Sequence, residues 1–180
     1  MLCQPADGTS LLSTPDSLHF TAFAHRDAVS VWASTSRRLY IIKVKGKRMA
    51  CIPHPLAFQN HEDEEVRFLC PDDSGGFWIA TSMGRILYGQ PEDSVFQDFS
   101  DRFDTQGMTI LNLLWRNHHL WLVSHNRFIH YDTQRHNLQQ YTSSDGNMST
   151  PIFRDQAAFL SADGTLYAGG RGCFVSVQSR

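Results

Sequence analysis

Short runs of aromatic and β-branched residues alternate with glycine-rich or polar turns along most of this chain. In residues 74–88, a glycine turn leads into Phe-Trp-Ile-Ala-Thr (77–81), followed by a second glycine turn and Ile-Leu-Tyr (86–88). Glycine provides the positive φ angles of tight turns, and Trp, Ile, Thr and Tyr suit a pleated sheet. The pattern therefore predicts a β-hairpin with arms over residues 77–81 and 86–88.

The same hairpin pattern occurs four times. Each copy carries one aromatic anchor in its first arm, at spacings of 46, 43 and 46 residues, and the anchors are Trp32, Trp78, Trp121 and Tyr167. A strand-like run precedes each anchor across a polar turn, at residues 20–24, 66–70, 110–115 and 157–160. Another run follows the second arm in the first three copies, at residues 48–52, 94–99 and 137–141. Each unit thus contains up to four predicted strands, and no segment has a helical period.

A repeat of forty-odd residues with four antiparallel strands is typical of a β-propeller blade. A β-sandwich would also have regular strands, but it would not repeat a whole four-strand unit. We therefore predict an all-β propeller of about four blades, in which adjacent blades stack and the anchors fill the space between them. The predicted boundaries are a lead-in at 1–16 and blades at 17–60, 61–104, 105–146 and 147–180.

The fourth predicted blade lacks its outer strand. In one interpretation, residues 9–12 supply that strand and close a four-bladed ring, since closure removes exposed sheet edges. In the other, the units are consecutive blades of a larger propeller. The residues themselves do not decide between the two.

Residues 73–88 resemble the two-component regulator propeller repeat, which reads roughly D-x-x-G-x-L-W-I-G-T-x-x-G-L-x-x-Y. Residues 119–132 and 138–141 are similar, and residues 145–172 resemble the final blade of the sensor region in hybrid two-component systems. The resemblance covers about residues 17–177. It departs from the repeat where the anchor-strand glycine, kept as Gly169, is replaced in the other copies by Ser34, Ala80 and Val123.

The resemblance implies a non-catalytic sensor module that responds to an oligosaccharide in the periplasm. It favours the interpretation as part of a larger propeller, whose partners would be the remaining blades and downstream sensor domains. The histidine kinase of such a protein has no counterpart in this chain. A homodimer through the open edge of the fourth blade is a further expectation.

Composition excludes several other classes of protein. The 180 residues carry a net charge of −2, which gives no basic footprint for nucleic acid. No apolar run approaches the roughly 18 residues of a membrane span, and the N-terminus lacks the pattern of a signal peptide. The four cysteines show no C-x-x-C pairing, so we expect free thiols rather than a zinc or redox site; they are Cys3, Cys51, Cys70 and Cys173.

The sequence contains no recognisable catalytic, metal or cofactor motif. Five of the nine histidines crowd the third predicted blade, at positions 118, 119, 125, 130 and 136, but none forms an H-E-x-x-H or similar motif. We expect solvated turn histidines there, and a solvated connection at the acidic run 61–65. A nucleophile elbow and a phosphate-binding loop are also absent.

Arginine recurs in the turn after each anchor strand. The candidates for ligand binding are Arg38 (or its neighbour Arg37), Arg85, Arg127 and Arg171. Equivalent turns of successive blades emerge on one face of a propeller, so these side chains can form an arc of positive charge that suits an acidic sugar. The turn at residues 83–85 is accordingly the part of the second hairpin that we expect to touch a ligand.

Two other functions remain open. One is a stand-alone propeller scaffold for protein–protein contacts, for which a four-bladed ring is one form. The other is a propeller lyase or glycosidase, which would need a charged cluster at the central channel that the sequence does not reveal.

Overall fold

The computed structural model describes residues 19–45, 48–57, 63–90, 93, 95–142 and 153–178. Within these residues the chain forms fifteen strands and one helical turn, arranged as four separate antiparallel sheets. Each sheet is a simple meander in which every strand pairs with the next one along the chain. This confirms the prediction of an all-β propeller built from antiparallel blades.

The blades are numbered here by their sheets. The first contains β1 (Ala22–Asp27), β2 (Ser30–Ser34), β3 (Arg38–Lys45) and β4 (Arg48–Ala57). The second contains β5 (Val66–Pro71), β6 (Phe77–Thr81), β7 (Ile86–Gly89) and β8 (Gln97–Asp98). The third contains β9 (Ile110–Arg116), β10 (His119–Ser124), β11 (Arg127–Asp132) and β12 (Asn137–Thr142). The fourth contains β13 (Phe153–Leu160), β14 (Leu166–Gly170) and β15 (Cys173–Val177).

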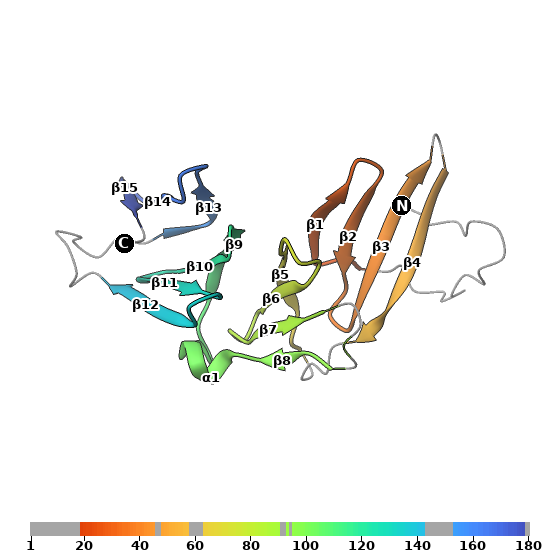
Figure 1. Cartoon of the computed structure of the whole chain (residues 1–180), viewed down its shortest axis with the longest axis horizontal. Helices are drawn as coiled ribbons and strands as arrows, with labels where there is room; N and C mark the ends of the chain where they lie inside the picture. Colours follow the sequence, from red (N-terminus) through yellow and green to blue (C-terminus); the bar gives the residue numbers. More distant parts are fainter. Residues whose placement is uncertain are drawn as a thin grey trace.

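The four sheets follow one another in an arc (Figure 1). The first strands of the blades pack in chain order, β1 against β5, β5 against β9, and β9 against β13. An ion pair between Arg67 of β5 and Asp155 of β13, at 3.0 Å, links the first strands of the second and fourth blades. The first strands therefore form the inner side of the arc, and the later strands of each blade lie farther out.

Three apolar clusters hold successive blades together. Trp32 packs against Phe77 between the first and second blades, with 4.5 Å between ring centroids. Trp78 lies in the cluster between the second and third blades, and Trp121 lies between the third and fourth. Tyr167 occupies the same register position in β14, but its side of the sheet faces away from the third blade. The structure thus places three of the four anchors between blades.

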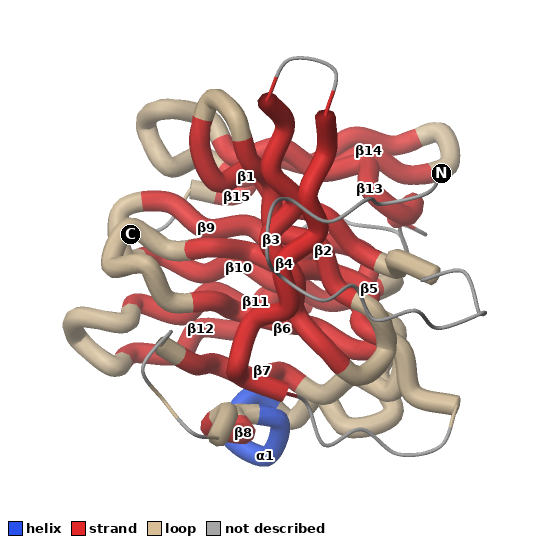
Figure 2. The backbone as a smooth tube through the Cα atoms, turned by 90° about the vertical axis from the view of Figure 1, so that its right-hand side faces the viewer, coloured by secondary structure: helices blue, strands red, loops and turns tan. Residues whose placement is uncertain are grey.

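One short helix interrupts the strand pattern. The helical turn α1 (Ser100–Phe103) lies beside β8 (Figure 2) and comes between β8 and β9 in the chain. The Asp98 carboxylate accepts hydrogen bonds from the backbone N–H and the hydroxyl of Ser100, which fixes the start of the turn. Four residues are too few to show a helical period, so sequence analysis missed this element.

Two predictions fall outside the described residues or remain untested. The closing strand at residues 9–12 lies outside the described part of the chain, and the blade boundaries stay predictions. Three strands of the fourth blade are described, as the sequence suggested. Among the described residues, neither Cys51 nor Cys70 forms a disulfide bond, and burial next to Asp72 raises the pKa of Cys70 to about 12.

Candidate ligand pocket between the second and third blades

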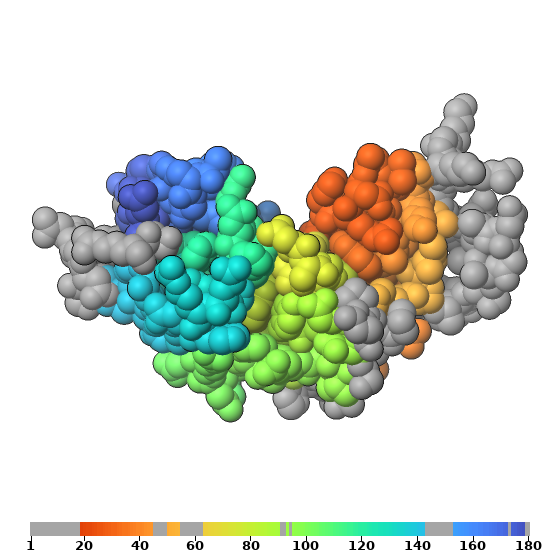
Figure 3. All heavy atoms as spheres, in the orientation of Figure 1, coloured from red at the N-terminus to blue at the C-terminus, as the bar shows by residue number. Residues whose placement is uncertain are grey.

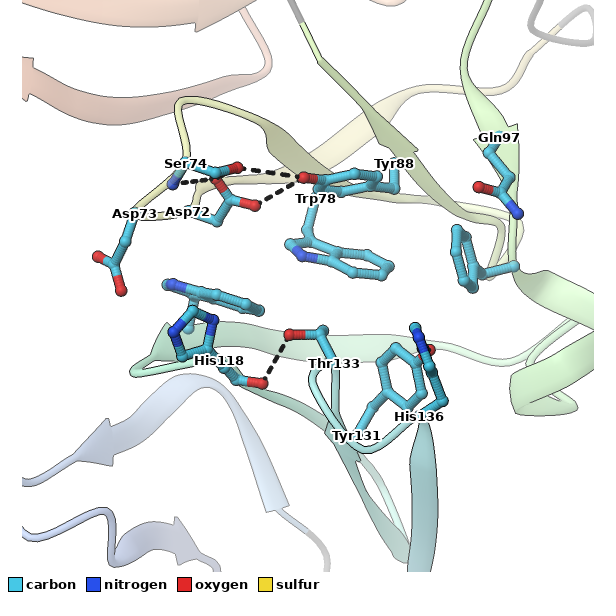
Figure 4. Close-up of a pocket in the computed structure, with 12 residues that line it drawn as sticks. Asp72, Asp73, Ser74, Trp78, Tyr88, Gln97, His118, Tyr131, Thr133 and His136 are labelled. Atoms are coloured by element: carbon cyan, nitrogen blue, oxygen red, sulfur yellow. Dashed lines mark hydrogen bonds between the residues drawn. The ribbon is translucent and has the colours of Figure 1, made fainter.

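A pocket of 430 Å³ opens between the second and third blades (Figure 4). The second blade contributes the β5–β6 turn and strands β6, β7 and β8, and the third contributes β9, the β9–β10 turn, β11 and the β11–β12 turn. The lining residues are Asp72, Asp73, Ser74, Trp78, Tyr88, Gln97, Phe99, Trp115, His118, Tyr131, Thr133 and His136. Its volume lies within the range of sites that hold small ligands, roughly 300–1,000 Å³.

The walls of the pocket are aromatic. Trp78 and Tyr131 are each 2% exposed, and their ring centroids lie 6.2 Å apart across the blade boundary. Tyr88 lies 4.6 Å from Trp78, and Phe99 lies 5.1 Å from it. Trp115 of the third blade is half-buried and completes the wall. The rings present an apolar surface whose outer part reaches solvent.

A network of hydrogen bonds around Asp72 fixes the rim of the pocket on the second blade. One carboxylate oxygen accepts the backbone N–H groups of Ser74 (2.8 Å) and Gly76 (2.9 Å), which closes the β5–β6 turn. The other oxygen accepts the Tyr88 hydroxyl at 2.8 Å. A Cβ at position 76 would lie 2.5 Å from that hydroxyl, so a larger residue there would displace the Tyr88 ring. Burial, together with the nearby Asp72 charge, raises the pKa of Tyr88, which stays a neutral donor.

The rim on the third blade is built from two turns. Asn117 and His118 both have positive φ, which lets the β9–β10 connection turn in two residues. The hydroxyl and N–H of Thr133 donate to the His118 carbonyl at 3.0 and 2.9 Å. The exposed His118 ring is thereby held beside the pocket, facing Asp73 and Ser74 across it (Figure 4).

His136 closes the far side of the pocket. Its Nδ1 lies 3.1 Å from the Tyr131 hydroxyl, and its backbone carbonyl accepts a hydrogen bond from Arg102 at 2.9 Å. The Arg102 guanidinium also lies over the Tyr131 ring, 4.9 Å from its centroid. The Arg102 guanidinium therefore covers one face of the Tyr131 ring, and the side of the ring toward Trp78 lines the pocket.

The arrangement is suited to recognition. Carboxylate, hydroxyl, amide and imidazole groups at the rim can exchange hydrogen bonds with a polar ligand, while the rings receive its apolar faces. Among the described residues, no group of three or more His, Cys, Asp or Glu side chains is placed to hold a metal ion.

Two of the four predicted arginines are engaged within the protein. Arg85 donates to the buried carboxylate of Glu64 and to Asp98, both at 3.1 Å. Arg127 donates to the Asp104 carboxylate at 3.3 Å and to Gln140 at 3.0 Å. Both guanidinium groups therefore link their own turn to neighbouring segments of the chain.

The other two arginines are solvent-exposed. Arg38 begins β3, and Arg171 lies in the β14–β15 turn. In the turn at residues 83–85, Gly84 is buried and the Gly107 N–H donates to the Met83 carbonyl at 2.8 Å, whereas Met83 is 41% exposed. None of the four arginines lines the pocket. The arginine arc stays a prediction, and the pocket is a separate candidate site.

Sequence analysis did not single out the pocket. It assigned His118 and His136 to solvated turns and treated the aromatics as packing. Two signals were nevertheless present. Trp115 is the one tryptophan outside the anchor position, and the paired histidines 118–119 have no counterpart in the matching turns of the other blades. Residues that break a repeat are candidates for a role that belongs to one blade.

A cluster of two histidines, His119 and His130, lies inside the third blade. His130 is 4% exposed, and its Nε2 lies 2.9 Å from Nδ1 of His119. Its ring stacks on Trp121 with centroids 4.4 Å apart, and its other nitrogen lies 3.3 Å from Gln139. Burial lowers the pKa of His130, the nearby His119 lowers it further, and Gln139 and Asp132 oppose the shift.

This cluster predicts a loss of stability on acidification. The unfolded chain takes up a proton near the ordinary histidine pKa of 6.5, whereas folded His130 resists it. The contribution of uncharged His130 to the free energy of unfolding is fully present above pH 6.5. It is lost as the pH falls through the lower pKa of the folded protein. We expect the urea-derived free energy of unfolding to decline below pH 6.5, and His130→Gln to make that decline shallower. An equal slope in both proteins would show that other groups control it.

No protein-family model matches the chain, and no curated protein matches it. Several solved structures do. The extracellular domain of the hybrid two-component system BT4673 of B. thetaiotaomicron matches with a TM-score of 0.61 and 12% identity, over 93% of this chain and 22% of that one. YCF48 bound to D1 peptide matches with a TM-score of 0.62 and 17% identity, over 89% of this chain and 51% of that one.

A designed protein matches over nearly its full length. The computationally designed Ika4 protein has a TM-score of 0.61 and 11% identity, over 93% of this chain and 94% of that one. Among the described residues, no helix is long and apolar enough to cross a membrane. At such low identities, the likeness to these structures is one of fold, and that fold is a set of propeller blades.

Proposed function

We propose that this chain is a non-catalytic ligand-recognition module, part of a propeller sensor, and that the pocket between the second and third blades binds a sugar unit of an oligosaccharide. The observation that carries the proposal is the combination of an aromatic wall with a polar rim in one pocket of 430 Å³. Aromatic rings accept the C–H faces of a sugar, and rim groups such as Asp73, His118 and Thr133 can bind its hydroxyl groups.

The position of the pocket suggests how binding could be transmitted. A ligand there contacts two blades at once, so it favours the relative packing of the two sheets that fits it best. The downstream sensor domains of a longer protein would receive this shift. The extracellular domains among the similar structures support an extracytoplasmic, two-component setting for the proposal.

A binding experiment tests the pocket. We expect titration calorimetry against a panel of neutral and acidic oligosaccharides to find a ligand whose affinity falls about five- to tenfold in Asp73→Ala and in His118→Ala, each removing one hydrogen-bonding group. Ala162 occupies the position of Asp73 in the matching turn of the fourth blade, so the turn tolerates alanine. His125→Ala, an exposed histidine of the same blade outside the pocket, is the control.

The same panel separates the pocket from the arginine turns. If Arg38→Ala and Arg171→Ala weaken an acidic sugar while the pocket variants leave it unchanged, the ligand binds at the arginine arc and the pocket proposal fails. Absence of binding by every oligosaccharide would reject the ligand class. A panel of peptides would then test the alternative of a protein-interaction scaffold, which the exposed aromatic side chains of the fourth blade favour.

A further inference from the structure

The side of the fourth blade that faces away from the third blade exposes positions that are buried in every other blade. The residue two places after each anchor pairs with a third-strand residue, which is Leu39, Ile86, Phe128 or Phe174 in blades one to four. The first three are 0% exposed and pack against the following blade. Phe174 is 67% exposed. It has the side chain of a blade interface, but no blade of the described residues packs against it.

Two more aromatic rings extend this surface. Phe159 lies directly opposite the anchor Tyr167 and is 64% exposed, and Tyr167 stacks on Phe174 with centroids 5.6 Å apart. The residues opposite the other three anchors all pack in the clusters between blades; they are Ala24, Cys70 and Leu114. Phe159, Tyr167 and Phe174 are called here the anchor-side face.

The opposite type of face is exposed on the first blade. The residue just before each anchor is Val31, Phe77, Leu120 or Leu166, and the last three are 0% exposed against the preceding blade. Val31 is 36% exposed. Phe23 of β1 is 59% exposed, whereas Leu69 and Leu113 at the same register position are 6% and 5% exposed. Phe23, Val31 and Phe20, whose ring lies 5.7 Å from Phe23, are called the receiving face.

We propose that the anchor-side face of one molecule docks on the receiving face of a second copy, head to tail, in the geometry of the blade contacts within the chain. Each of the three contacts between blades within the chain joins the anchor side of one blade to the opposite side of the next blade. In the described structure, the anchor side of the fourth blade and the opposite side of the first blade have no such partner. The first blade (orange) and the fourth blade (blue), which carry these faces, lie at the two ends of the arc on either side of a hollow in the surface (Figure 3). A second copy carries both complements, which makes the contact heterologous. This inference is independent of the proposed ligand.

Solution mass tests the docking. We expect light scattering or sedimentation at about 100 μM to find particles of two or more copies, and Phe174→Asp to give monomers because it places a charge in the contact. Val95→Asp is the control, since Val95 is 66% exposed but belongs to neither face. A wild-type protein that stays monomeric across this concentration range overturns the proposal. Circular dichroism confirms that each variant is folded.

Mixing two variants tests the head-to-tail arrangement. Phe23→Asp damages only the receiving face, and Phe174→Asp damages only the anchor-side face, so each variant alone is expected to be monomeric. Their equimolar mixture retains one intact contact and is expected to form a heterodimer of two copies. If Phe23→Asp alone still dimerises, or if the mixture stays monomeric, the contact is not head to tail.

Discussion

Replacement of Gly84 by alanine is expected to destabilise the fold by roughly 3 kcal/mol or more, a large fraction of the stability of a typical domain. Gly84 has φ of +78°, a conformation that disfavours residues with a Cβ. A Cβ there would lie 2.1 Å from the Thr105 carbonyl oxygen and 2.8 Å from the Met108 nitrogen. These are backbone atoms, so no side-chain rotation relieves the overlap. The loop between α1 and β9 would have to move off the second blade.

A second glycine provides the matched control. Gly75 has φ of +87°, but a Cβ there would meet nothing within 4 Å. Gly75→Ala therefore carries only the backbone cost, about 1–2 kcal/mol. Urea unfolding of both variants, followed by tryptophan fluorescence, measures the difference. Equal losses would show that backbone strain alone decides, and that the close approach of residues 105–108 does not matter.

The second large effect is expected at Trp121. Its side chain is fully buried between the third and fourth blades, stacked on His130 and packed in the cluster with Phe153 and Leu166. Trp121→Ala should lower the free energy of unfolding by about 3–5 kcal/mol, because it removes apolar contacts and leaves a cavity. The indole N–H has no hydrogen-bond partner in the described structure, so the loss is one of packing.

Tyr167 is the control that the repeat itself provides. It holds the same register position in the fourth blade, but its ring lies on the anchor-side face and is only half-buried. Tyr167→Ala is expected to cost about 1 kcal/mol, as for a partly exposed position, when measured in dilute protein where copies do not associate. Comparable losses for Trp121→Ala and Tyr167→Ala would mean that burial between blades is not what the anchor contributes.

The indole N–H groups also bear on the pocket. Trp78 and Trp115 line it, and each has a buried Nε1 without a hydrogen-bond partner in the described structure. Trp121 has the same property and lies away from the pocket. These N–H groups are therefore not specific to the pocket, and the proposal depends on the rim and the rings.

Much of the fold could be predicted because the repeat is local. Each predicted hairpin is set by neighbours within a few residues, such as the glycine turn at Gly75 and the β-favouring run that follows it. The same local signals recur at a spacing in the forties, which identifies blades without knowledge of any contact between them. The sequence pattern did not predict the helical turn α1, because α1 depends on one carboxylate, that of Asp98, and has no period of its own.

The sequence alone therefore determined the strands, the order of the blades and three of the four residues that anchor them, since these depend on local propensity and on repetition. The tertiary structure decided which faces meet. Only the stacking of the second and third blades brings Trp78 to Tyr131 and leaves a pocket beside them. Only the folded chain gives Arg85 its partner Glu64, 21 residues away, an ion pair that the sequence pattern did not predict. Contacts between sheets depend on long-range packing, which no period in the sequence encodes.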